Sequence, residues 1–179
     1  EYQAAGKRAC YGLLPESMSH EGYMAHPVHS YWDDFWAVRG FRDAAAMAGI
    51  LGEAAEQARI AALCADFQRT LYASIDHVIR ERQLDFLPGS VEFADFDPSA
   101  TLIAVTVADE LPRLPRDMVE KTCDKYLQGF RQRASGAVPW ANYSAYEIRI
   151  IGALVRLGRR RDAHELLAFF LADRRIPPW

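Results

Sequence analysis

SHEGYMAHPVHSYWDDFWAVRGFRD, residues 19–43, carries the strongest pattern in this 179-residue chain. It holds three of the five histidines, two adjacent aspartates and a run of large aromatic residues. Apolar residues recur at helical spacing in its second half and beyond, which predicts a helix over residues 30–51. The first half is polar and is predicted to be a loop. We therefore expect a loop that turns into a helix, with the unusual residues gathered at the turn.

The chemistry of this stretch indicates a ligand site. Packed cores exclude so many carboxylates, and ordinary solvated loops do not collect so many aromatic rings. A sugar needs both kinds of group, because its hydroxyls bond with Asp and His while its C–H faces stack on Trp and Tyr. The stretch therefore predicts a carbohydrate-handling site.

Helical periodicity continues along the rest of the chain, so the sequence predicts an all-α fold in one region, residues 1–179. A long second helix is expected over residues 53–83. Asp97 followed by Pro98 predicts a cap and a first-turn proline for a short third segment that ends near residue 108. Further helices are predicted from residue 115 to Gly136, over residues 144–157 and over residues 162–173.

The connections between these helices indicate how they are arranged. Three are short, at Gly52, residues 111–115 and residues 158–161, so we expect three antiparallel αα-hairpins. The long connections then share one end of the array, which is where a helical scaffold normally builds its binding site. Besides the first stretch, the candidates expected at that end are Glu92, Asp95, Asp97, Trp140, Tyr143 and Glu147.

Composition limits the partners. The net charge of −3 argues against nucleic acid or an anionic membrane surface, and no apolar run approaches the ~20 residues of a membrane span. Cys10, Cys64 and Cys123 are widely spaced and are expected to be free thiols rather than disulfides. The chain begins at Glu1 without a leader pattern, so a signal peptide is expected to be missing or removed, and the localisation stays unknown.

Two segments, GLLPESMSHEG (residues 12–22) and HSYWDDFWAVRGFRDAA (residues 29–45), resemble the six-hairpin glycosidases. The segments at residues 87–101 and 142–158 look like further loop-plus-helix units of bacterial proteins of this kind, some of which carry coagulation factor 5/8 type domains. The resemblance implies an (α/α)6 toroid, a glycoside hydrolase, and an oligosaccharide or polysaccharide as partner. Three hairpins are expected in this chain, whereas a complete toroid has six. The resemblance therefore implies that the chain is a segment of a larger catalytic domain, inactive alone, with a second carboxylate beyond Trp179.

Glycoside hydrolysis uses two carboxyl groups, of which one protonates the leaving oxygen. We expect Glu92 in this role, because it lies between apolar Val91 and Phe93 with Asp95 and Asp97 close behind. The alternative is that Glu92 caps a turn or pairs with an arginine such as Arg149. Glu147 is a second candidate acid, or half of a helix-surface ion pair.

Adjacent helical residues point about 100° apart, so only one of Asp33 and Asp34 can face the site. The resemblance favours Asp34 as the residue that grips sugar hydroxyls. Trp32 and Trp36 form an i,i+4 pair that provides either a stacking wall or inter-helix packing, and packing is the favoured interpretation for Trp36. The expected substrate-binding residues are Tyr31, Trp32, Asp33, His29, Asp95, Trp140, Tyr143 and Glu147.

No metal and no cofactor is expected, because His20, His26, His29 and Glu21 match no zinc-ligand spacing. Two other classes stay open. Residues 145–175 imitate a helical-repeat unit that would bind a peptide, although the hairpin lengths vary too much for a fixed period. A polysaccharide lyase could use Tyr143, His29 and Arg149, but the acidic loops disfavour a uronate site.

Overall fold

The structure, a computed structural model, describes residues 5–18, 23, 25–140 and 144–172. Within these ranges the chain is mostly helical and has no strand, apart from isolated bridges between Ser17 and Val28 and between Ser30 and Ser90. The all-α prediction is therefore confirmed. The elements are η1 (Ala5–Cys10), α1 (Tyr31–Ile50), α2 (Ala54–Arg82), α3 (Pro98–Thr101), α4 (Ile103–Thr106), α5 (Arg116–Ala134), η2 (Ala145–Ile148), α6 (Arg149–Arg156) and α7 (Arg160–Ala172).

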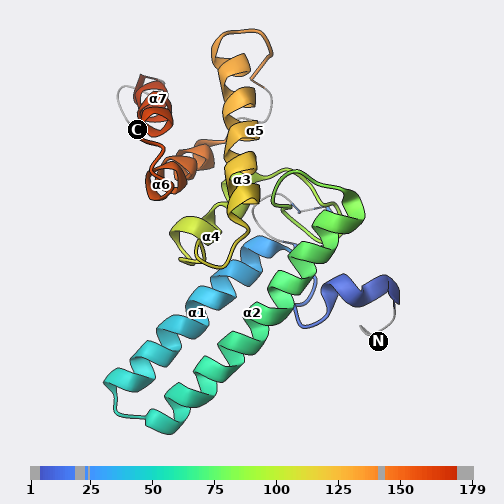
Figure 1. Cartoon of the computed structure of the whole chain (residues 1–179), viewed down its shortest axis with the longest axis vertical. Coiled ribbons are helices and arrows are strands. Elements are labelled where there is room, and N and C mark those ends of the chain that lie inside the picture. Colours follow the sequence, from blue (N-terminus) through green and yellow to red (C-terminus); the bar gives the residue numbers. More distant parts are fainter. Residues whose placement is uncertain (1–4, 19–22, 24, 141–143, 173–179) are drawn as a thin grey trace.

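Helices α1 and α2 form the long hairpin that the sequence predicts, and they lie side by side in Figure 1. Phe35 and Val38 on α1 are buried, as are Leu71, Ile75 and Val78 on α2, because each set follows the helical period. Gly52 lets the chain reverse between the two helices at a positive φ of 79°. The boundaries of both helices differ from the predicted ones by a single residue.

The predicted third helix is instead two separate four-residue helices, α3 and α4, joined at Leu102. Asp97 caps α3 as expected, because its side chain accepts hydrogen bonds from the Ala100 N–H at 3.1 Å and from the Ser99 hydroxyl at 2.7 Å. Most of the segment is buried, including Leu102 and Ile103. It fills the core between the larger helices, so the predicted middle hairpin with α5 does not form.

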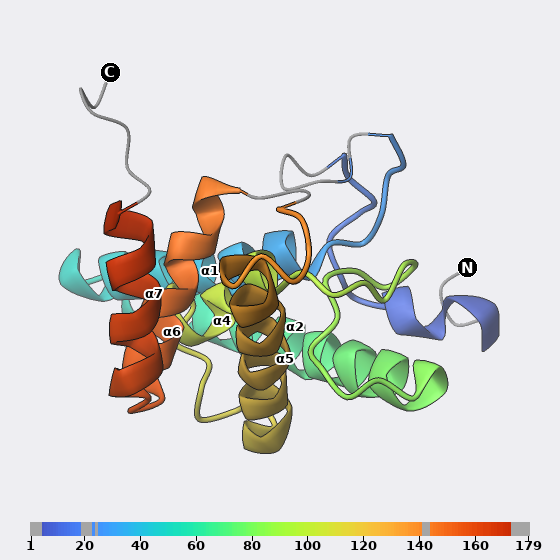
Figure 2. The ribbon, with the colours of Figure 1, turned by 90° about the horizontal axis from the view of Figure 1, so that it is seen from above.

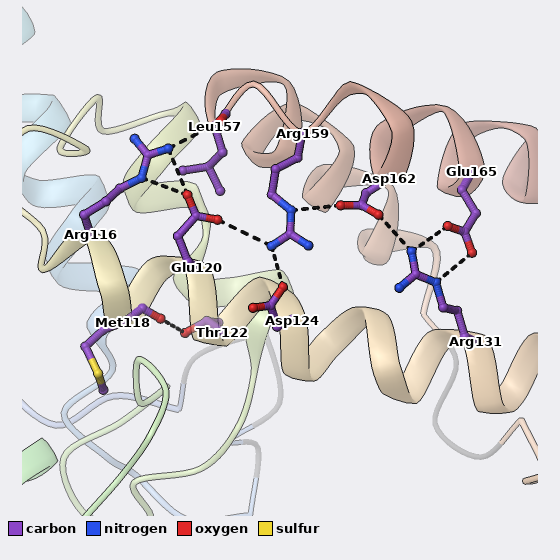
Figure 3. A network of polar contacts seen from close by, with 10 residues as sticks. All are labelled: Arg116, Met118, Glu120, Thr122, Asp124, Arg131, Leu157, Arg159, Asp162 and Glu165. Carbon is purple, nitrogen blue, oxygen red and sulfur yellow. Dashed lines mark hydrogen bonds and ion pairs between the residues drawn. The ribbon is translucent and has the colours of Figure 1, made fainter.

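Helices α6 and α7 form a second antiparallel pair, and α5 lies beside them (Figure 1). A chain of ion pairs joins α5 to α7 (Figure 3). Arg131 on α5 contacts Asp162 at 2.8 Å and Glu165 at 2.7 Å, while Arg159, just before α7, contacts Asp124 at 2.7 Å and Asp162 at 2.9 Å. Arg159, in the short connection before α7, therefore holds α5 and α7 together.

The helices do not form one up-and-down curve, because α1 and α2 run across the direction of α5, α6 and α7 (Figure 2). The start of α1 nevertheless meets the loop at residues 84–97, since the Tyr31 N–H donates to Gly89 and the Val91 N–H donates to His29. The first two of the long connections therefore lie together, as their lengths predict. None of the helices in the described ranges combines the length and hydrophobicity that a membrane crossing requires.

Candidate functional site

An open groove with a volume of about 890 Å³ lies over the first turns of α1. We call it the tryptophan groove. The segment at residues 14–17 forms one wall, and residues from α4 and the start of α6 complete it. Its lining residues are Leu14, Pro15, Glu16, Ser17, Trp32, Asp33, Trp36, Ile103, Val107 and Arg149.

The two tryptophans of the groove differ in how much ring they expose. Trp32 is only 5% exposed, and the guanidinium of Arg149 lies 4.7 Å from the centre of its ring. Trp36 is 44% exposed and packs edge-on against Trp32, with ring centroids 5.7 Å apart. The packing interpretation of Trp36 is therefore wrong, because much of its ring faces the groove and not a neighbouring helix.

The adjacent aspartates also face different surroundings. Asp33 lines the groove, and its Oδ2 accepts a hydrogen bond from the Ser17 hydroxyl at 2.6 Å. Asp34 is fully buried, and its Oδ1 accepts the Leu14 N–H at 3.0 Å. The expectation that Asp34 grips a sugar therefore needs correction. The helical step of about 100° turns Asp34 into the protein and leaves Asp33 at the surface of the groove.

Burial changes the acidity of Asp34. Its Oδ2 is buried and has no hydrogen-bond partner within the described residues. The pKa of this carboxyl rises from 3.8 to about 7, mainly because of burial; the hydrogen bond from the Leu14 N–H opposes the rise and the charge of Asp33 adds to it. Asp34 is therefore partly protonated near neutral pH, which suits a buried structural acid.

Glu92 lies in a second cavity of about 370 Å³, which we call the cysteine cavity. Its Oε2 accepts the backbone N–H of His29 at 2.9 Å, and its Oε1 lies 2.7 Å from the His29 ring Nδ1. The Cys10 thiol contacts the same Oε1 at 3.9 Å. The partner of Glu92 is thus a histidine and not Arg149. Glu16 lines both cavities. Asp33 lines only the tryptophan groove and Glu92 only the cysteine cavity, so these two carboxylates do not face the same space.

Tyr31 and Asp95, both expected to bind substrate, make internal contacts. The Tyr31 side chain is fully buried, and its hydroxyl lies 2.8 Å from the Ser74 hydroxyl. The Asp95 carboxylate accepts hydrogen bonds from the Tyr23 hydroxyl at 2.8 Å and from the Ser90 hydroxyl at 2.8 Å. Neither residue lines the tryptophan groove: Tyr31 joins α1 to α2, and Asp95 holds the loop at residues 84–97 to Tyr23.

Glu147 and Trp140 lie farther along the chain and also have partners inside the protein. The Glu147 carboxylate contacts the Arg133 guanidinium at 2.7 Å and accepts the Tyr126 hydroxyl at 2.6 Å. The Trp140 ring stacks on Phe169 with centroids 5.1 Å apart. These contacts hold η2 and α7 against α5. Three further residues singled out from the sequence, Tyr143, His20 and Glu21, lie outside the described residues.

One buried acid escaped the sequence reasoning. Glu110 is fully buried after α4 and pairs with Arg42 on α1. It also accepts hydrogen bonds from Gln68 at 3.0 Å and from the Tyr72 hydroxyl, both on α2. Arg113, three positions along, also contacts Glu110 at 3.6 Å. The partners on α1 and α2 lie 38 to 68 positions away in sequence, too far apart for spacing to reveal them.

Compared with known proteins, the chain matches no family model, and no curated protein or solved structure is significantly similar to it. The function must therefore be inferred from the site itself.

Proposed function

We propose that the tryptophan groove binds a sugar unit of an oligosaccharide or polysaccharide, as part of a glycoside hydrolase built on an (α/α)6 toroid. The observation that carries this proposal is the exposed ring of Trp36 beside the carboxylate of Asp33 in one open groove. The antiparallel pairs α1–α2 and α6–α7 are the kind of unit that such a toroid repeats, which supports the proposed parent architecture.

Each part of a sugar has a fitting partner in the groove. The C–H face of a pyranose stacks on the exposed Trp36 ring, since aromatic faces favour flat, weakly polar surfaces. Ser17 occupies one oxygen of Asp33, and a carboxylate accepts hydrogen bonds at both of its oxygens, so a sugar hydroxyl can donate to the other. Glu16 and Arg149 add further polar groups along the rim. The groove therefore combines stacking with hydrogen bonding.

Glu92 remains a prediction as the general acid, but its geometry gives this role little support. Both of its oxygens are engaged by His29, and it faces the cysteine cavity rather than the tryptophan groove. The proposal therefore assigns sugar binding to the groove and places the proton transfer elsewhere in the complete catalytic domain.

Binding to a glycan array, followed by titration of the best glycan, tests the proposal. Trp36→Ala removes the stacking ring, and Asp33→Asn removes a charged hydrogen bond worth about 1.5–3 kcal/mol, so affinity should fall at least about tenfold in the second variant. Phe93→Ala is the matched control, because Phe93 is an exposed aromatic residue outside the groove. Its affinity should equal that of the wild type.

Two results would refute sugar binding at this groove. One is a wild-type protein that binds no glycan, and the other is Trp36→Ala binding as tightly as Phe93→Ala. An unsaturated product that absorbs in the ultraviolet would instead identify a polysaccharide lyase. The helical-repeat alternative is disfavoured by the unequal hairpins, because α1 and α2 have 20 and 29 residues whereas α6 and α7 have 8 and 13.

A further inference from the structure

The cysteine cavity brings together three side chains that can each donate an electron pair to a metal ion. Cys10 comes from the end of η1, His29 from the segment before α1, and Glu92 from the loop between α2 and α3. One ligand atom of each, a sulfur, a ring nitrogen and a carboxylate oxygen, lies within 4.8 Å of the other two. Among the described residues, no other group of three or more His, Cys, Asp or Glu side chains brings its ligand atoms this close together.

The contact between His29 and Glu92 does not by itself explain why Cys10 lies beside them. Cys10 is half-buried, and its thiol sits against the Glu92 carboxylate. Burial, followed by the charges of Glu92 and Glu16, raises the pKa of this thiol to about 11, against a smaller lowering by Lys7. A neutral thiol held against a carboxylate is a weak hydrogen-bond donor that contributes little to stability.

We propose that Cys10, His29 and Glu92 bind a Zn²⁺-type cation through sulfur, nitrogen and oxygen. Thiolate and imidazole ligands together select zinc or a similar transition metal over Mg²⁺ or Ca²⁺. On binding, the Cys10 thiol releases its proton to solvent and a sulfur–metal bond takes its place. The negative charge that disfavours the thiolate in the free protein attracts the divalent ion.

Zinc binding requires only small shifts of the three ligand atoms, which now lie within 4.8 Å of one another. Ligands placed ~2.0–2.3 Å from a tetrahedral zinc ion lie about 3.3–3.8 Å from one another. The ring Nδ1 of His29 and the Oε1 of Glu92 are closer than this, at 2.7 Å, so the ion would enter between them and replace their hydrogen bond. The Glu92 side chain is 34% exposed, so its Oε1 has room to move once the ion replaces the contact with His29. Three protein ligands leave the fourth position open toward the cavity.

This site goes beyond the proposed sugar groove, because it lies in a different cavity and involves none of the tryptophans. The sequence gives no sign of it. Cys10 and Glu92 are 82 positions apart, and His29 and Glu92 are 63 apart, so no short ligand motif exists.

Titration of the chelator-treated protein with Zn²⁺, against a competing chromophoric chelator, measures the affinity and the stoichiometry. We expect one ion per chain. Cys10→Ser and Glu92→Gln should each weaken binding by at least about 10–100-fold, the loss typical even for groups that only support the ligands. His77→Gln is the matched control, because His77 lines the same cavity without joining the cluster, and its affinity should be unchanged.

Two readouts identify the sulfur ligand. With Co²⁺ in place of Zn²⁺, the wild type and Cys64→Ala should show a thiolate-to-cobalt charge-transfer band, and Cys10→Ser should lack it. In the unmutated protein, Zn²⁺ should slow alkylation of Cys10 by iodoacetamide, which needs no variant to fold. A wild-type affinity no tighter than that of Cys10→Ser would overturn the proposal, and so would equal alkylation rates with and without Zn²⁺. Loss of glycan binding would leave these results unaffected.

Discussion

Asp34 should make the stability of the protein fall as the pH rises. Its pKa is about 7 in the folded protein, because burial disfavours the charged carboxylate, against 3.8 for an exposed aspartate. The folded state therefore holds a proton that the unfolded state has already lost between these two pH values. Under linkage, the free energy of unfolding decreases with rising pH over that window and becomes flat above the folded pKa.

The size of the effect follows from the two pKa values. Each unit of difference corresponds to about 1.4 kcal/mol, so the ionised Asp34 lowers the free energy of unfolding by about 4 kcal/mol above pH 7. The variant Asp34→Asn resembles the protonated acid in shape, keeps an oxygen for the Leu14 N–H and does not titrate. It should equal the wild type near pH 4 and exceed its stability by up to about 4 kcal/mol near pH 8.

Urea unfolding of both proteins at a series of pH values measures this difference directly. The matched control is Asp33→Asn, since Asp33 is the adjacent acid and faces the groove rather than the interior. It should keep the pH dependence of the wild type, because the Asp33 charge is the smallest of the causes that act on Asp34. A stability difference between Asp34→Asn and the wild type that stays constant from about pH 5 to about pH 8 would show that Asp34 is ionised throughout.

Two more predictions concern the ion pairs of the fold. Glu110→Ala removes a fully buried carboxylate and leaves the Gln68 and Tyr72 donors without that acceptor, so it should cost about 1–3 kcal/mol of unfolding free energy. Asp43→Ala, at an exposed pair, should cost little, and equal losses in urea unfolding would contradict a buried network. Arg159→Ala breaks two contacts to α5, at Glu120 and Asp124, and one to Asp162 on α7, and should cost about 1 kcal/mol, less at high salt. The exposed Arg80→Ala should be nearly neutral in thermal unfolding.

The sequence predicted the parts of the fold that depend on local chemistry. The helical period gave α1 and α2 almost to the residue, and the Asp97 cap with Pro98 gave the start of α3. The prediction was wrong where burial on all sides decided the structure. Seven of the nine residues at 98–106 are buried, including the polar Thr101, so no one-sided apolar period indicated that the segment would form two short helices in the core.

The site, like the fold, was predictable from the sequence where it depends on neighbouring residues and not where it depends on distant contacts. A groove lies over the aromatic and acidic stretch, whose residues are neighbours in sequence. The roles within it depended on residues 14–17, which pack onto α1 through Leu14 and Ser17. Those contacts turn Asp34 into a buried anchor and leave Asp33 in the groove, a choice that the helix period alone leaves open.

The segment at residues 14–17 also links the two proposed sites. Asp34 and Asp33 hold it from one side, and Glu16 within it lines both the tryptophan groove and the cysteine cavity. A cation at Cys10 would attract the Glu16 carboxylate, which now raises the pKa of that thiol. The two sites therefore share one short wall, and binding at one site can change the affinity of the other. The sugar affinity should be measured with and without Zn²⁺, and the Zn²⁺ affinity with and without the sugar, in the wild type and in the Trp36 and Cys10 variants.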